Sequence, residues 1–375
     1  MQSEKHLHII SFNTPYPPSY GGIIDVYFKL LALYENGVKV HLHVFYSGKK
    51  PVISSLDNIC FEVKYYTRKR LVNPFRNKMP LMVQSRHSWL LYEALLKDEY
   101  PIFFEGLHCT YLLDHPAFKD RIKIVRMHNI EHLYYKNLAA VEPRFIKRIY
   151  LKFEAKRLKN YEEILHHATK TASISPADHK IIDQGFHNSF YLPVFQPNNE
   201  ILSKIGKGDY VLYHGNLGVA ENNEAALFLV NEVFNELDLP FIIAGANPSK
   251  GLRKAISGKP HIQLRSDINT GQIYDLVQNA QINIMPTFQD TGIKLKLVNS
   301  LFMGRHCIVN SKMVNETGLE SLCRIADQPQ QLRSLVVQYF NEEFTQAEIT
   351  QREKILMSLF DNRQNAALLT EVVFG

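Results

Sequence analysis

Two loops of this sequence place glycine immediately before a predicted helix, an arrangement that can hold a phosphate. The first loop ends in Gly21 and Gly22, and the second contains Gly292 followed by Lys294 and Lys296. Glycine lets backbone N–H groups approach an anion closely, and the helix dipole adds a favourable potential. The first loop has neither the GxGxxG spacing nor the lysine of a P-loop, so dinucleotide and P-loop nucleotide binding are not supported. The alternatives are a plain tight turn for the first loop and polar N-capping of a helix for the second.

Strands and helices alternate along the first half of the chain. Short apolar runs and segments with helical periodicity follow one another between loops rich in Pro, Gly and Asn. The expected strands are 8–10, 38–44, 102–104, 123–127 and 171–174. The expected helices are 23–34, 88–97, one after residue 108, and a long charged helix over 144–168. This order predicts a parallel sheet covered by helices.

A second series follows residues 193–207, whose Pro, Asn, Gly and Lys content predicts a linker. Its expected strands are 210–214, 241–245, 261–264, 282–285 and 307–309, and its expected helices are 221–236, 271–279 and 296–303. We therefore expect an α/β protein of two Rossmann-like, doubly wound parallel-sheet domains, 1–192 and 208–357, facing a cleft. Ligands of such sheets bind at the C-terminal ends of the strands.

Composition bounds the class of protein. The chain has 375 residues, of which 45% are hydrophobic and 21% charged, as expected for a globular protein of two domains. No apolar run reaches the roughly 18 residues of a membrane span, and the N-terminal segment lacks a secretory signal pattern, so a cytoplasmic location is expected. The four cysteines are far apart and without CxxC spacing, which predicts neither a disulfide framework nor a zinc site.

Basic residues are concentrated in the first half. Residues 1–200 hold 27 Lys and Arg against 19 Asp and Glu, whereas residues 201–375 hold 16 against 18. The clusters within 68–78 and 147–159 suit peripheral contact with anionic lipid headgroups or with a phosphate-bearing acceptor, and a solvated helix face is the alternative. No zinc-finger spacing or RNA-binding aromatic motif accompanies them, so no nucleic-acid partner is expected.

Several segments, in this order, resemble glycosyltransferases of the GT-B fold, in particular the large family 4 of retaining, sugar-nucleotide-dependent enzymes that build bacterial surface polysaccharides. The resemblance spans nearly the whole chain. It rests on the Pro-Pro-Ser-Tyr-Gly-Gly loop ending at Gly22, on Arg126–Glu131, on Leu212–Asn216, on Phe241–Gly245, and on Thr291–Lys296 with Gly304. The amphipathic segment 351–373 resembles the family's C-terminal helices, so residues 358–375 are expected to return to the first domain.

The resemblance implies a nucleotide-sugar donor, a glycan or lipid-linked acceptor, and roles for residues at matching positions. His128 would act in catalysis by hydrogen bonding the donor sugar or orienting the leaving group. Glu105 and His108 would lie on the acceptor side. The implied donor contacts are Gly21, Gly22, Gly292, Ile293, Lys294 and Lys296 for the diphosphate, Gly215, Asn216, Arg265 and Asn299 for the nucleotide, and Thr291 for the sugar. Helix N-termini and lysines replace a metal in this class, so no metal or other cofactor is expected.

The sequence departs from the family where two glutamates commonly stand eight residues apart. Those positions are Thr291 and Asn299 here. Asn299 can still hydrogen bond a ribose hydroxyl, and Asp290 can supply the acidic group, which makes it a second catalytic candidate. No basic pair follows Gly215, and Arg265 is the candidate substitute. Besides hexosyl transfer, the alternatives are a non-catalytic homologue that binds nucleotide or glycan and a nucleotide-sugar epimerase.

Overall fold

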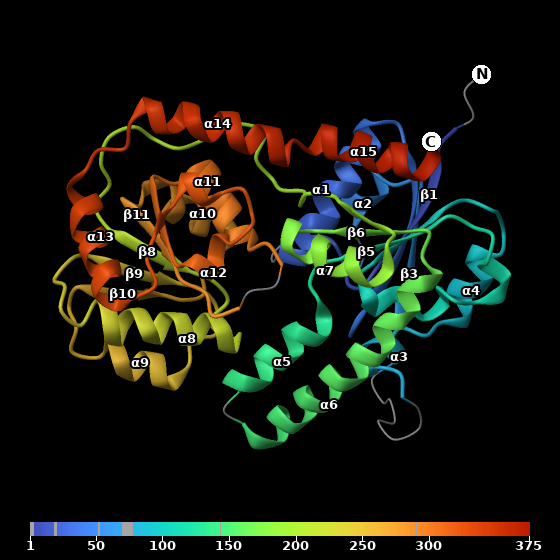
Figure 1. Ribbon diagram of the computed structural model, residues 1–375, viewed down its shortest axis with the longest axis horizontal. Coiled ribbons are helices and arrows are strands. Elements are labelled where there is room, and N and C mark those ends of the chain that lie inside the picture. The colour runs from blue at the N-terminus through green and yellow to red at the C-terminus, as the bar shows by residue number, and fades with distance from the viewer. Residues whose placement is uncertain (1–3, 19–20, 52, 70–77, 143, 290–291) are drawn as a thin grey trace. The chain divides into compact units, whose positions relative to one another are not determined.

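The computed structural model describes residues 4–18, 21–51, 53–69, 78–142, 144–289 and 292–375. The chain divides into two compact α/β units (Figure 1). Unit 1 comprises Met1–Ala139, Phe145–Pro197 and Phe360–Gly375, and unit 2 comprises Ala140–Arg144 and Asn198–Leu359. Each unit contains one parallel sheet with helices, which confirms the expected fold class.

The sheet of unit 1 has seven strands among the described residues, in the order β3-β2-β1-β4-β5-β6-β7, and all neighbours are parallel. The strand order reverses between β1 and β4. At such a reversal the loops after the strands part, and Rossmann-like sheets bind their ligands there. The strands are β1 (His6–Ser11), β2 (Lys39–Tyr46), β3 (Glu62–Thr67), β4 (Ile102–Glu105), β5 (Lys123–Met127), β6 (Lys170–Ser173) and β7 (Ser189–Tyr191).

Helices cover both faces of this sheet. On one face, Leu7 and Ile9 of β1 pack against Leu30 of α1 and Leu369 of α15, so the C-terminal helix lies beside α1 (Figure 1). On the other face, Ile10 packs with residues of α3, α4, α6 and α7. The helices are α1 (Gly21–Glu35), α2 (Ser54–Asp57), α3 (Leu81–Gln84), α4 (Trp89–Leu95), α5 (Glu131–Val141), α6 (Phe145–Tyr161), α7 (Pro176–Phe186) and α15 (Asn362–Phe374), with 3-10 turns at Leu107–Leu112, Pro116–Phe118 and Glu162–His167.

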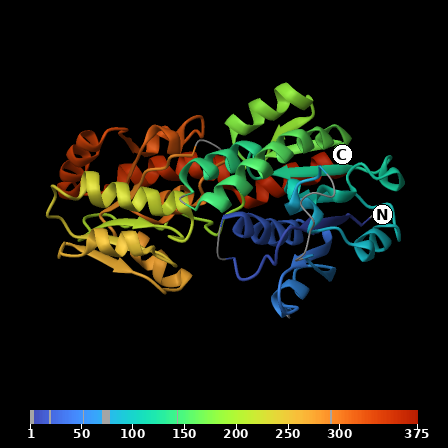
Figure 2. The same ribbon diagram turned by 90° about the horizontal axis from the view of Figure 1, so that it is seen from below.

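Unit 2 repeats the same strand order, β10-β9-β8-β11-β12-β13, with the reversal between β8 and β11. Its strands are β8 (Val211–His214), β9 (Phe241–Ala244), β10 (Ile262–Arg265), β11 (Ile282–Met285), β12 (His306–Val309) and β13 (Arg324–Ile325). Its helices are α8 (Ala220–Phe228), α9 (Lys250–Ile256), α10 (Thr270–Asn279), α11 (Leu295–Met303), α12 (Ser311–Val314), α13 (Pro329–Asn341) and α14 (Gln346–Phe360), with a π-helix at Leu229–Val233 and a 3-10 turn at Glu320–Leu322. Helices α8 and α9 lie side by side (Figure 2).

Three expected helices differ from the structure. The helix expected after His108 is a 3-10 turn that already contains this residue. The helix expected over 144–168 is α6 followed by a 3-10 turn, and the helix expected over 221–236 is α8 followed by the π-helix. Elsewhere β5 and β11 have the expected bounds, 123–127 and 282–285.

Two further properties concern the helices and the cysteines of the described part of the chain. None of its helices combines the length and the apolar character needed to cross a lipid bilayer. All four cysteines are buried and form no disulfide.

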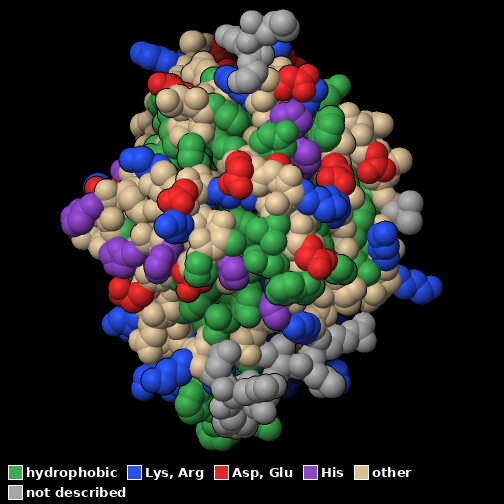
Figure 3. Space-filling view, turned by 90° about the vertical axis from the view of Figure 1, so that its right-hand side faces the viewer, with side chains coloured by type: hydrophobic (Ala, Val, Ile, Leu, Met, Phe, Trp, Pro, Cys, Tyr) green, Lys and Arg blue, Asp and Glu red, His purple; other side chains and the backbone are tan. Residues whose placement is uncertain are grey.

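A histidine network lies between β1 and β2, toward the amino-terminal ends of these strands. His6 Nδ1 is 2.9 Å from His41 Nε2, and His8 Nδ1 is 2.9 Å from His43 Nε2. His8 Nε2 also contacts Asp98 Oδ1 at 2.9 Å. Burial lowers the pKa of His8 to about 4, so the ring is neutral at pH 7. Histidine side chains reach the surface at several places on this side of unit 1 (Figure 3).

Candidate active site

The carboxyl ends of β1, β4 and β5 bring aromatic and acidic side chains together in unit 1. Glu105 ends β4, and His128 follows β5 directly. The ring centroid of Phe12, after β1, lies 5.6 Å from the ring of His128 and 5.7 Å from the ring of His108. A Cβ added to Gly22 at the start of α1 would lie 3.0 Å from Cζ of Phe12. Four of the residues expected at a site, Gly22, Glu105, His108 and His128, therefore lie near the point between β1 and β4 where the strand order reverses, and three of them lie close to the Phe12 ring.

Behind His128 lies a fully buried ionic network. Lys29 Nζ donates to Glu105 Oε1 at 2.6 Å and to Asp25 Oδ2 at 3.1 Å. Arg126 Nη2 donates to Asp25 Oδ1 at 3.0 Å. His128 Nε2 lies 3.2 Å from Glu105 Oε2, and its Nδ1 lies 3.9 Å from Asp25 Oδ2. Both ring nitrogens of His128 thus face carboxylates.

The charges of this network keep both carboxylates ionised. Burial alone would raise the pKa of Asp25, but Arg126 and Lys29 hold it well below its usual value. Burial also acts to raise the pKa of Glu105, and Lys29 and His128 lower it overall. The Glu105 carboxylate is fully buried, and Lys29 and His128 contact its two oxygens. In this structure Glu105 therefore orients His128 and exposes no oxygen to a sugar acceptor.

The same network contains the one group of three possible metal ligands found in the described residues, Asp25, Glu105 and His128. Their ligand atoms lie within 4.8 Å of one another. Lys29 already pairs with both carboxylates and Arg126 with Asp25, so a divalent cation would have to displace or approach these positive charges. We therefore assign the group as an ion-pair network.

The turn after β4 depends on a glycine. Gly106 has φ +81°, and a Cβ there would lie 3.1 Å from Nδ1 of His108 and 3.6 Å from Cδ2 of His128. His108 is half-buried in this turn, and desolvation, followed by the charge of Arg86, holds its pKa well below the usual range. Its Nδ1 lies 3.9 Å from Glu131 Oε1, and burial raises the pKa of Glu131 to about 8. At pH 7 this pair is therefore neutral, an environment that is common at functional sites.

In unit 2, Lys296 occupies the corresponding reversal point, on the first turn of α11. Its Nζ donates to Asn222 Oδ1 at 3.1 Å and lies 5.1 Å from the centroid of the Tyr213 ring. Burial lowers the pKa of Lys296 to about 8, which Glu221 opposes and Lys294 assists. Lys296 is consequently mostly protonated at pH 7. An anion bound beside its buried ammonium group would stabilise the charged form further.

The N-terminus of α11 adds backbone donors beside this lysine. Lys294 is the N-cap, and its ammonium group, which is a donor only, provides no side-chain cap for the helix. Its Nζ lies 3.4 Å from the carbonyl oxygen of Gly292, which has φ +67°. Ile293 is buried. The unpaired first N–H groups of a helix and its dipole favour an anion at this end.

Two glycines let the ends of β8 and β9 approach each other closely. A Cβ on Gly245 would lie 1.8 Å from the carbonyl oxygen of Gly215, so a larger residue is excluded. Asn222 Nδ2 donates to the carbonyl oxygen of Asn216 at 3.1 Å, and its Oδ1 accepts from Lys296. Asn222 therefore joins Gly215 and Asn216 to the lysine on α11.

The remaining candidates lie apart from this group or outside the described residues. Arg265 is exposed at the end of β10, where its guanidinium donates to Gln263 Oε1 at 3.0 Å. Asn299 is buried one turn after Lys296, and its Oδ1 accepts from Asn198 Nδ2 at 3.3 Å. Asp290 and Thr291, expected as catalytic and sugar-binding residues, lie outside the described residues.

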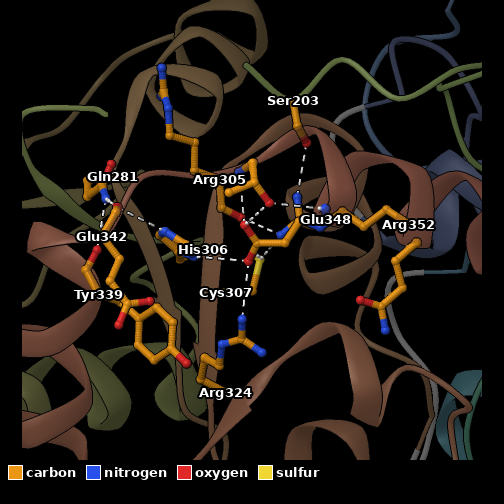
Figure 4. Close-up of polar contacts among 12 residues, drawn as sticks. Ser203, Gln281, Arg305, His306, Cys307, Arg324, Tyr339, Glu342, Glu348 and Arg352 are labelled. Carbon is orange, nitrogen blue, oxygen red and sulfur yellow. Dashed lines mark hydrogen bonds and ion pairs between the residues drawn. The ribbon is translucent and has the colours of Figure 1, made fainter. Parts of the chain in front are cut away.

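A further polar cluster in unit 2 links α14 to the end of the sheet (Figure 4). Arg352 donates to the carbonyl oxygen of Leu301 and to Ser203 Oγ, both at 3.0 Å. Glu348 accepts from Arg324 Nη2 at 3.1 Å. The cavity among these side chains measures about 20 Å³, room for about one water molecule. The cluster is therefore a structural connection of α14 and not a ligand site.

Sequence reasoning assigned no role at these sites to Asp25, Lys29, Arg126 or Asn222. Asp25 and Lys29 stand in an otherwise apolar helical segment, and Arg126 stands inside an apolar strand. A charge within an apolar run is a usable signal, because buried charges require partners. Asn222 is uncharged, and its position beside Lys296 follows from its contacts with Asn216 and Lys296 in the folded chain.

Comparison by sequence finds one uncharacterised relative. No protein-family model matches the chain. The chain is 28% identical over 316 residues to an uncharacterized 44.6 kDa protein in the cps region of Klebsiella pneumoniae, and the alignment covers 78% of this chain and 79% of that protein.

Comparison by structure finds proteins of the same fold over the whole chain. A variant of TarM from S. aureus in complex with fondaparinux, α-GlcNAc-glycerol and UDP matches with a TM-score of 0.72 at 9% identity, covering 99% of this chain and all of TarM. Sucrose-phosphate synthase from Thermosynechococcus elongatus matches with a TM-score of 0.68 at 13% identity, covering 98% of each chain. Anabaena HepE in complex with UDP and glucose matches with a TM-score of 0.64 at 11% identity, covering 97% of this chain and 98% of HepE. These likenesses confirm the GT-B fold.

Proposed function

We propose that this chain is a glycosyltransferase that moves a hexose from a nucleotide-sugar donor to a hydroxyl of a glycan or lipid-linked acceptor. The observation that carries the proposal is the start of α11, where Lys296 and Lys294 lie at the N-terminal end of a helix beside the point at which the strand order of a Rossmann-like sheet reverses. The fold supports it, because the similar structures include TarM with UDP and α-GlcNAc-glycerol, and HepE with UDP and with UDP-glucose.

We assign the donor diphosphate to unit 2. When the bond between the anomeric carbon and the diphosphate oxygen breaks, negative charge collects on that oxygen. Lys296 and the positive end of the α11 dipole stabilise this charge without a divalent cation, and Lys294 adds a second ammonium group. Gly292 and Ile293 bring the backbone close to the phosphates, while Gly215, Asn216 and Asn299 are proposed to contact the nucleoside.

We assign the transferred sugar to His128 of unit 1. Both ring nitrogens of His128 face Glu105 and Asp25, so contact with a sugar hydroxyl requires the ring to turn about its Cα–Cβ bond and to leave the 3.2 Å contact with Glu105. Gly21 and Gly22 are proposed to add N–H groups for the diphosphate at the start of α1. Retention of the anomeric configuration and independence of metal belong to the same proposal, as does a place in polysaccharide synthesis at the cytoplasmic side of a membrane.

Donor turnover tests the proposal. We would measure release of nucleoside diphosphate from UDP-, GDP-, ADP- and dTDP-hexoses, with magnesium or with a chelator, and with alkyl glycosides as model acceptors. One donor is expected to turn over equally with and without magnesium, and His128→Ala is expected to abolish this release while diphosphate binding changes by no more than a few-fold. Release that is equal in wild type and His128→Ala would remove His128 from the mechanism. Diphosphate binding without any turnover would favour the non-catalytic homologue.

A further inference from the structure

Helix α6 of unit 1 exposes an unusual amount of apolar surface. Ile146 is 84% exposed, Phe145 71% and Phe153 65%, and Ile149 and Tyr150 are also exposed. Of the eighteen large hydrophobic side chains that are exposed among the described residues, these five lie on this one helix. Single exposed hydrophobic side chains are normal on a protein, whereas a group of them marks an interaction surface.

The five side chains form one continuous stripe along α6. Positions 145, 149 and 153 repeat every four residues, and positions 146 and 150 lie directly beside them on the helix surface. The opposite side of the helix holds Leu151, Glu154 and Leu158, which are buried. Because that side already holds α6 against unit 1, the apolar stripe is not needed for folding of the helix onto its own unit. In Figure 1, α6 runs along the lower edge of unit 1.

Positive charge borders the stripe. Lys152, Lys156 and Lys159 are exposed and follow one another at spacings of four and three residues, along one border of the stripe. Within Phe145–Tyr161 there are six Lys and Arg against a single acidic residue, Glu154. Glu154 is on the buried side, where burial raises its pKa, so it contributes no exposed negative charge.

We propose that α6 docks unit 1 onto the surface of a membrane that contains anionic phospholipid. Phe and Ile side chains enter the boundary between headgroups and acyl chains, Tyr150 lies at the headgroup level, and the lysines contact lipid phosphates. Charge decides against a second copy of the chain as occupant, because pairing two α6 stripes would bring two basic borders together. The proposal concerns a surface apart from the residues assigned to the donor and the sugar, and it holds whether or not the chain transfers sugar.

Vesicle co-sedimentation of the full chain, without nucleotide, tests the proposal. We expect binding to phosphatidylcholine vesicles that contain phosphatidylglycerol, weaker binding at high salt, and little binding to phosphatidylcholine alone. The double variant Ile146→Ser/Phe153→Ser and the triple variant Lys152→Gln/Lys156→Gln/Lys159→Gln should each lose at least about tenfold in vesicle affinity. All five positions are exposed, so circular dichroism and the thermal midpoint should match those of wild type.

Matched variants in unit 2 provide the controls. Ile205→Ser/Val337→Ser removes two exposed hydrophobic side chains, and Lys250→Gln/Lys254→Gln/Lys354→Gln removes three exposed lysines. Both should bind vesicles as wild type does. Equal binding by the α6 variants, or no preference for phosphatidylglycerol, would overturn the proposal. A dimer in sedimentation velocity that dissociates in Ile146→Ser/Phe153→Ser would also overturn it and identify a second copy as the occupant.

Discussion

Raising the pH from about 7 to about 9 is expected to weaken binding of the nucleoside diphosphate proposed for this chain about tenfold, because Lys296 loses its proton in the free protein. Burial lowers the pKa of Lys296 to about 8. With that value roughly nine-tenths of the free protein carries the ammonium at pH 7, and roughly one-tenth at pH 9. A bound diphosphate raises the pKa of Lys296, so the complex keeps the proton throughout this range.

The direction in which affinity changes with pH follows from this difference in the pKa of Lys296 between the free and the bound protein. Binding must take up a proton above pH 8, so affinity falls with rising pH and is constant below it. The terminal phosphate of a nucleoside diphosphate has a pKa near 6 and is ionised throughout, so it adds no pH dependence of its own to the affinity between pH 7 and pH 9. The tenfold loss corresponds to about 1.4 kcal/mol of binding free energy.

Isothermal titration calorimetry at several pH values measures this loss, and Lys296→Arg is the matched control. A guanidinium stays charged across the range, so the variant should lose the pH dependence even if its affinity at pH 7 is lower. Titration of the ligand itself affects both proteins equally and cancels in the comparison. Affinity that is constant from pH 7 to pH 9 in wild type, or the same slope in Lys296→Arg, would refute the assignment of Lys296 to the diphosphate.

Four further predictions concern the stability of unit 1. Asp25→Asn should lower the free energy of unfolding by about 3–5 kcal/mol in urea titrations, because the buried Arg126 and Lys29 lose their shared carboxylate; a change below 1 kcal/mol would mean that the network is not energetically coupled. The pKa of His8 is lowered from its ordinary 6.5 to about 4, so the unfolded chain takes up a proton at a higher pH than the folded one. About 3 kcal/mol of the free energy of unfolding is therefore lost as the pH falls from 6.5 to 4, and none above pH 6.5. His8→Gln should remove this part of the pH dependence of stability, and an unchanged profile of stability against pH would contradict the prediction. Gly106→Ala should cost about 1–2 kcal/mol and reduce turnover, since a Cβ at φ +81° is strained and crowds His108; wild-type turnover would show that the turn can rearrange. Leu369→Ala should cost about 2–5 kcal/mol by opening a cavity where α15 packs in the core of unit 1, and a protease digest should then release the C-terminal helix early; full resistance to the protease would count against that packing.

Strands buried on both faces could be predicted almost residue by residue. Residues 123–127 and 282–285 each combine Ile, Val or Met with one or two polar side chains, and every residue of both strands is buried, as is typical of a central parallel strand. β3 was missed because it lies at the edge of the sheet and is half-exposed, so Glu62 and Lys64 interrupt its apolar pattern. α5 was missed because it buries little of its length, Glu131 and Ala139, and therefore shows no clear apolar stripe.

The candidate sites were predictable where local sequence determines them. Glycine before a helix and lysine in its first turn mark the start of α11 without any knowledge of the fold. The ionic network behind His128 was not predictable, because Arg126 and Asp25 are 101 residues apart and pair only once β5 and α1 have come together. For the same reason the acceptor-side expectation for Glu105 could not anticipate that Lys29, 76 residues away, holds its carboxylate in the interior.

Direct binding of nucleoside diphosphates to the purified chain tests the central proposal most directly. We would titrate UDP, GDP, ADP, dTDP and CMP in the absence of metal, into wild type, Lys296→Met and the exposed-lysine control Lys354→Met. One diphosphate is expected to bind, with affinity at least about tenfold weaker in Lys296→Met and unchanged in Lys354→Met. Absence of binding to any of them at millimolar concentration, or equal affinity in Lys296→Met and wild type, would contradict the proposal that the start of α11 holds the diphosphate of a sugar donor.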